Sequence, residues 1–170
     1  GKLPFGFTDT YGKITFGGGG SKLSLFGFNF NDRASVLNDS TGLSFADYLW
    51  NSYGFGGNFT IVPPGSSVLV NGHFASSKYF IGLYEDDEND GVINYDDTGR
   101  SSEISGFNFG LDFKYVAGED NIEYGIEVIG LRTEFETYNS IGVPVGPPPN
   151  STTEFGSYID YTINRGDLII

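Results

Sequence analysis

Residues 103–136 read EISGFNFGLDFKYVAGEDNIEYGIEVIGLRTEFE and predict a long β-hairpin with two chemically different faces. Every second residue from Phe107 to Tyr115 is apolar or aromatic, and the residues between are Asn108, Gly110, Asp112 and Lys114. Because successive side chains of a strand point to opposite faces, this alternation produces one apolar and one polar surface. Strands of soluble proteins usually have about five or six residues, whereas a strand crossing a bilayer needs about 9–11. The hairpin therefore favours a transmembrane β-barrel.

The composition supports an all-β protein and excludes several functions. The chain has 170 residues, 26 of them Gly, and 16% aromatic residues. Glycine costs about 1 kcal/mol in a helix, and aromatic residues favour strands. The net charge of −13 argues against nucleic acid as a partner, because phosphates require a basic surface. The absence of Cys excludes disulfide scaffolds, zinc–cysteine clusters and thiol catalysis. A soluble, secreted β-sandwich remains the alternative architecture.

The same period-two alternation recurs in five other segments. The residues expected on their apolar faces are Ile14, Phe16, Phe26, Phe28, Phe30, Tyr53, Phe55, Phe59, Ile61, Val68, Val70, Phe74, Phe155, Ile159 and Tyr161. In one of these segments Leu23 and Leu25 fall on the face opposite to the phenylalanines. A charge facing lipid near the bilayer midplane costs about 2–4 kcal/mol, so charged residues are expected on the lumen side. The lumen-facing set comprises Asp112, Lys114, Glu123, Glu127 and Asp160, together with Lys13.

The connections between these segments alternate in length. Short, turn-rich connections are expected at 17–21, 63–66, 117–121 and 164–167. Long connections are expected at 33–50, 85–102 and 137–151. Tight periplasmic turns and long outer loops are typical of outer-membrane barrels and unusual in Greek-key sandwiches. The pattern predicts an antiparallel up-and-down transmembrane β-barrel segment with seven to eight strands, the eighth beginning at Leu168, and long loops outside the cell.

Several segments resemble barrel strands of TonB-dependent receptors of the Bacteroidetes type. The resemblance lies in Gly20–Phe30, Tyr53–Phe59, Gly72–Tyr79, Tyr124–Glu127 and Thr153–Tyr158. It implies a barrel of about 22 strands whose lumen is plugged. An inner-membrane TonB complex would energise uptake, and a surface lipoprotein is a further candidate partner. Under this resemblance, residues 1–170 form a partial barrel domain with no plug domain visible, within a longer receptor.

An acidic loop is the candidate metal site. Asp86, Glu88, Asp90 and Asp97 fall at spacings found in calcium loops, with Gly91 at the sharp turn. Asp replaces the usual bidentate Glu at the last position, and no helices are predicted on either side. The alternative is a solvated acidic loop that holds cations loosely. No other cofactor is expected.

The sequence does not predict an enzyme. His73 is the only histidine, and Ser76 and Ser77 follow it closely. Ser76 would lie on the opposite face of the strand, and Ser77 would lie about 13 Å away on the same face. Neither spacing places a hydroxyl within hydrogen-bond reach of the imidazole, as nucleophilic catalysis requires.

The function expected from these observations is uptake of an unidentified ligand by an outer-membrane TonB-dependent receptor. The alternative is a small, complete eight-stranded outer-membrane barrel with a structural or adhesion role. An outer-membrane lipase and a soluble binding module are the less favoured hypotheses.

Overall fold

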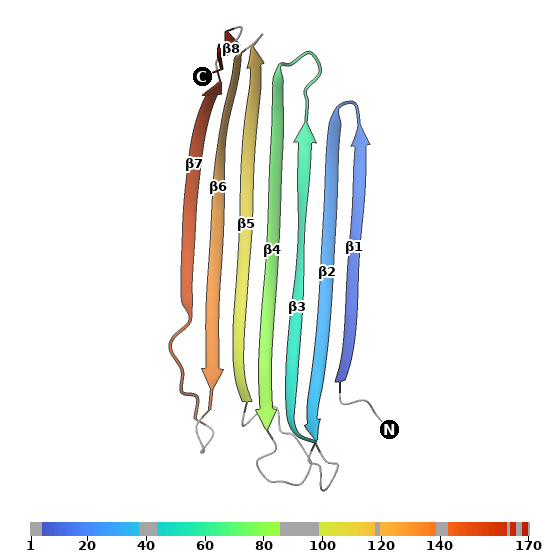
Figure 1. Ribbon diagram of the computed structural model, residues 1–170, viewed down its shortest axis with the longest axis vertical. Coiled ribbons are helices and arrows are strands. Elements are labelled where there is room, and N and C mark those ends of the chain that lie inside the picture. Colours follow the sequence, from blue (N-terminus) through green and yellow to red (C-terminus); the bar gives the residue numbers. More distant parts are fainter. Residues whose placement is uncertain are drawn as a thin grey trace.

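Seven long antiparallel strands form one sheet in the computed structural model (Figure 1). The structure describes residues 5–37, 44–85, 99–117, 120–138, 143–162, 164–165 and 168–169. The strands are β1 (Phe5–Gly18), β2 (Ser21–Leu37), β3 (Ser44–Ile61), β4 (Val68–Glu85), β5 (Gly99–Ala117), β6 (Asp120–Thr137) and β7 (Asn150–Thr162). Each strand pairs with the next one in the chain, which confirms the predicted up-and-down order.

The sheet is open within the described residues. β1 and β7 each have a single neighbouring strand, and no pairing joins them. β8 (Asn164–Arg165) and β9 (Leu168–Ile169) form a separate two-stranded sheet. The expectation that 164–167 is entirely a turn is therefore wrong for its first two residues, which are paired with β9. The described residues contain no helix with the length and hydropathy needed to cross a membrane.

Two glycine-containing turns set the register at one end of the sheet. Gly19 and Gly20 join β1 to β2 with φ values of 60° and 84°. Two consecutive positive φ angles are typical of the type I′ hairpin turn, which suits the twist of the flanking strands. Between β3 and β4, Gly65 has a φ of 72°, and the Ser66 amide donates to the Pro63 carbonyl at 3.0 Å. This is the geometry of a type II turn with glycine at its third position.

The strands are longer than the sequence predicts. β2 continues to Leu37 and β3 begins at Ser44, so most of the expected loop 33–50 is paired strand and only 38–43 connects the two. β5 begins at Gly99, and β6 continues to Thr137. The ladder of backbone hydrogen bonds extends through these polar segments although strict alternation ends before them. By the bounds of the strands, the difference between short and long connections therefore holds for 86–98 and 138–149 but not for 38–43.

An apolar band crosses one face of the sheet, in the half nearer the glycine turns. We call this the band face, and the band comprises Ile14, Phe16, Leu23, Leu25, Phe55, Phe59, Ile61, Val68, Val70, Phe74, Phe107, Phe109, Leu111, Phe113, Tyr115, Ile122, Tyr124, Ile126, Val128, Phe155, Ile159 and Tyr161. None of these residues is charged. Beyond the band, towards the long connections, the same face carries Lys78, Glu103, Arg132, Glu134 and Glu136.

The register corrects the placement of three phenylalanines. Phe26 lies beside Lys13, and Phe28 and Phe30 follow on the same face of β2, opposite to the band. Leu23 and Leu25 lie on the band face instead, where Leu23 pairs with Phe59. Alternation within one strand separates its two faces but does not say which face continues a neighbour's surface. The tight turn after β1 decides this, because it fixes the register of β2.

The sheet is a single layer and has almost no core of its own. Among the described residues, Ala46 is the only buried residue with an apolar side chain. Within the band, Phe155 is 69% exposed and Ile159 is 77% exposed. A sheet normally buries an apolar face against another element, so this band requires a covering that the described residues do not supply.

Candidate functional site

The face opposite the band carries the polar residues singled out from the sequence, and we call it the network face. The register places Asp112, Lys114, Glu123, Glu127 and Asp160 together on this face, in the half nearer the glycine turns. That this face lines a lumen stays a prediction.

Cross-strand polar contacts connect these residues. The Lys114 ammonium forms an ion pair with Glu123 on the neighbouring strand. The Tyr158 hydroxyl donates to Asp112 Oδ1 at 2.8 Å and reaches it across Gly125, which lies between the two in the register. A Cβ at Gly125 would lie 2.5 Å from both side chains. Glycine is therefore needed for this hydrogen bond to span two strands.

His73 lies at the margin of this network. Its Nε2 is 3.7 Å from Glu127 Oε1, and that carboxylate oxygen also accepts a hydrogen bond from Asn108 Nδ2 at 2.9 Å. Ser76 lies on the band face, and Ser77 lies on the network face four residues along β4 from His73. The structure thus places these serines on the faces predicted for them, and neither bonds His73 in the described part of the chain.

Over β1 to β4 the other half of the network face is aromatic and contains a cavity of about 800 Å³, which we call the aromatic hollow. Its lining comprises Phe5, Gly6, Phe7, Asp9, Phe30, Asp32, Arg33, Ala34, Trp50, Asn51, Ser52 and Tyr79, from β1 to β4. Phe28 and Phe30 stack with ring centroids 5.1 Å apart, and Tyr48 and Trp50 stack at 5.8 Å.

Sequence reasoning missed the aromatic hollow because it assigned Phe26, Phe28 and Phe30 to the lipid side. Leu23 and Leu25 were the signal that could have corrected this, since both are apolar and lie on the opposite face. Once they are placed in the band, the phenylalanines of the same strand belong to the network face.

Glycines on β3 create space for the aromatic rings of β2. A Cβ at Gly54 would lie 2.9 Å from the Phe28 ring, and one at Gly56 would lie 2.8 Å from the Phe26 ring. The rings therefore lie across the neighbouring strand, over positions without side chains. This packing explains why glycine occurs inside strands, where it otherwise weakens them.

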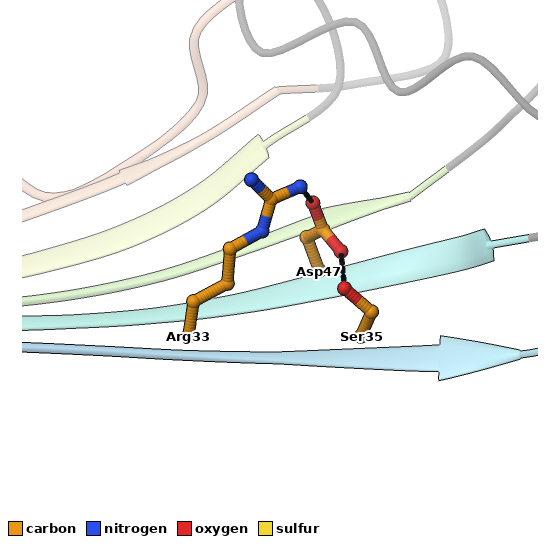
Figure 2. Close-up of polar contacts among 3 residues, drawn as sticks. All are labelled: Arg33, Ser35 and Asp47. Atoms are coloured by element: carbon orange, nitrogen blue, oxygen red, sulfur yellow. Dashed lines mark hydrogen bonds and ion pairs between the residues drawn. The ribbon is translucent and has the colours of Figure 1, made fainter. Parts of the chain in front are cut away.

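A buried carboxylate lies near the long connections on the band face. Figure 2 shows Arg33 and Ser35 of β2 directed at Asp47 of β3. Asp47 is completely buried; its Oδ1 accepts from Ser35 Oγ at 2.6 Å, and its Oδ2 pairs with the Arg33 guanidinium. An unpaired buried carboxylate would be costly, so this arrangement satisfies a polar group that cannot reach water.

A second ion pair lies on the band face, beyond the apolar band. Lys78 Nζ is 2.6 Å from Glu103 Oε1. The hydrogen bond to Glu103 raises the pKa of Lys78 above its usual 10.5, because it favours the protonated ammonium. The pair is partly exposed, so we assign it little stability.

The predicted calcium ligands Asp86, Glu88, Asp90 and Asp97 lie outside the described residues. Within the part of the chain that the structure describes, no three metal-ligating side chains come together. Comparison with known protein-family models, curated proteins and solved structures finds no match.

Proposed function

We propose that this chain forms part of the wall of an outer-membrane β-barrel transporter of the TonB-dependent class, which takes up a ligand through a plugged barrel. The apolar band carries the proposal. It crosses all seven strands, contains no charged residue, and is widely exposed. A continuous exposed apolar surface of this kind indicates contact with lipid or with another protein.

The height of the band supports lipid as the covering. On β5 the band extends from Phe107 to Tyr115, which is about 26 Å along a strand at about 3.3 Å per residue. Tilted by about 40°, as strands of membrane barrels are, this gives about 20 Å along the bilayer normal, close to the apolar height of outer-membrane barrels. A soluble sheet would not need to end its apolar surface at one height on adjacent strands.

The network face supports a polar lumen behind the band. Asp112, Lys114, Glu123 and Glu127 lie on this face at the height of the band, and each takes part in an ion pair or a side-chain hydrogen bond. This distribution is typical of barrels whose strands alternate between lipid and a polar interior.

The length of the strands supports a large wall that extends beyond the bilayer. β3 to β6 have 18 or 19 residues each, about twice the length needed to cross the membrane. In the proposed orientation the extra half is extracellular and carries the aromatic hollow on the lumen side. The resemblance of the strands to TonB-dependent receptors favours energised uptake, with the inner-membrane TonB complex and a surface lipoprotein as partners.

Depth-dependent fluorescence quenching tests the membrane part of the proposal. Trp50 is the only tryptophan and lies outside the band. In bilayers with brominated acyl chains, Trp50 emission should be weakly quenched. The double variant Trp50→Phe/Phe109→Trp moves the fluorophore into the band, and its emission should be strongly quenched. Equal quenching of both proteins would refute lipid contact at the band.

The size of the polypeptide in its source membrane tests the transporter part. A chain several times longer than 170 residues would support a receptor with a closed barrel and plug. A chain of about 170 residues would support the small eight-stranded barrel instead and would refute the receptor.

A further inference from the structure

We propose that the aromatic hollow is a binding site for a small organic cation, an ammonium or guanidinium group carried on an apolar body. This proposal uses the proposed function in one respect only, namely the side of the membrane from which the ligand reaches the hollow. The site itself is argued from the charges and rings that line the hollow.

Two carboxylates, one on β1 and one on β2, lie at neighbouring register positions in the hollow. Asp9 pairs with Phe30 in the register, and Asp32 pairs with Phe7 on one side and Trp50 on the other. Asp9 and Asp32 are therefore diagonal neighbours on one face, a relation that separates α-carbons by about 7–8 Å. Both side chains are exposed, so a ligand can reach them.

No cation of the described residues neutralises this pair of carboxylates. Arg33 also contributes to the lining of the hollow, but its guanidinium forms an ion pair with Asp47, which the register places on the opposite face. Lys13 lies four residues along β1 from Asp9, about 13 Å at strand rise. Two like charges held close together attract a cation more strongly than either would alone, and the net charge of −13 adds to this field.

Aromatic rings surround the carboxylates. Phe7, Phe30 and Trp50 line the hollow and lie next to Asp32 in the register, and Tyr79 lines it two strands away, on β4. The faces of aromatic rings attract cations, and Trp is the most effective of them. A neutral apolar ligand would leave the two carboxylates without a partner, whereas an inorganic cation would not use the rings. Only an organic cation complements both features.

The volume of the hollow sets the scale of the ligand. About 800 Å³ lies within the range of sites that hold drug-sized molecules. The hollow is therefore large enough for a ligand with a substantial apolar body.

Trp50 provides a built-in reporter for the test. The full chain in lipid bilayers is titrated with benzyltrimethylammonium chloride, with NaCl holding ionic strength constant, and Trp50 emission is followed. Saturable quenching is expected, with a dissociation constant of about 0.1–1 mM. The neutral isostere neopentylbenzene, which has the same shape without the charge, should bind at least about tenfold more weakly.

Two charge-neutralising variants locate the site. Asp32→Asn should weaken binding of the cation about tenfold, with the unperturbed Trp50 emission maximum showing that the hollow is intact. Glu154→Gln removes one negative charge from the same face at the opposite edge of the sheet and should leave the affinity unchanged. Calorimetry on Trp50→Leu, which lacks the reporter, should show weaker binding by about fivefold.

Three results of the cation titrations would overturn the proposal. These are linear quenching without saturation, equal affinity for the neutral isostere, and equal loss of affinity in Asp32→Asn and Glu154→Gln. Saturable binding of maltose in place of the cation would assign the hollow to neutral carbohydrate and would also overturn it. Failure here leaves the lipid-quenching result unaffected, because that experiment reports on the band at Phe109 and this one on the hollow.

Discussion

A single charge placed at the centre of the apolar band should destabilise the folded chain strongly. Leu111 is the middle residue of the band on β5, which extends from Phe107 to Tyr115. It lies four residues from either end, about 13 Å along the strand, which in the proposed membrane orientation is about 10 Å along the bilayer normal at a tilt of about 40°. Leu111→Arg should therefore cost about 2–4 kcal/mol, whereas Tyr115→Arg, at the edge of the band, should cost about 0–1 kcal/mol.

The register supplies a control at the same height. Asn58 pairs with His73, which pairs with Gly110, the residue next to Leu111. The Asn58 side chain lies on the network face, so the arginine of Asn58→Arg enters a polar environment and should change the free energy of unfolding little.

Urea titration of the chain in phospholipid bilayers measures all three variants. With a slope of about 2 kcal/mol per molar urea, a cost of about 2–4 kcal/mol should lower the midpoint of Leu111→Arg by about 1–2 M. The reasoning fails if Leu111→Arg costs no more than Asn58→Arg, or if Tyr115→Arg costs as much as Leu111→Arg. It also fails if removing the bilayer leaves the midpoint of the unmodified chain unchanged.

Two further substitutions test the packing within the sheet. A Cβ at Gly72 would overlap the Phe59 ring, so Gly72→Ala should lower the free energy of unfolding by about 1–3 kcal/mol. Gly156 has open space around it, so Gly156→Ala should leave the free energy of unfolding unchanged. Equal urea midpoints for the two variants would contradict the placement of the Phe59 ring. Arg33→Met should cost about 1–3 kcal/mol, because it leaves the buried Asp47 carboxylate without its guanidinium, although the half-exposed arginine limits the loss. The double variant Arg33→Met/Asp47→Leu should recover most of that stability, and a double variant as unstable as the single would refute the explanation.

Much of the strand pattern could be predicted from the sequence. The period-two alternation of Phe107–Tyr115 identified the two faces of β5, and the acidic and basic residues between them do share one face with those of β6 and β7. The glycine pair Gly19–Gly20 and the Pro-Pro-Gly segment marked turns that the structure contains. These predictions succeeded because each depends on residues close together in the chain, where backbone geometry alone dictates the outcome.

The ends of the strands could not be predicted in the same way. Residues 33–50 lack strict alternation, and loop structure was expected for them. In the structure Asp32 pairs with Trp50 and Arg33 with Leu49, so the ladder continues. Backbone hydrogen bonds from a strand already in register extend it through sequence that would not form a strand alone.

The sequence by itself determined that this chain forms amphipathic antiparallel strands in chain order, and which residues of each strand share a face. Only the tertiary structure decided how those faces join across the sheet. The register moved Phe26, Phe28 and Phe30 from the band to the network face and brought Asp9 and Asp32 together among aromatic rings. The physical reason is that alternation belongs to a single strand, whereas register belongs to a pair of strands. A shift of one residue exchanges the two faces, and the turns and the hydrogen-bond ladder fix that choice.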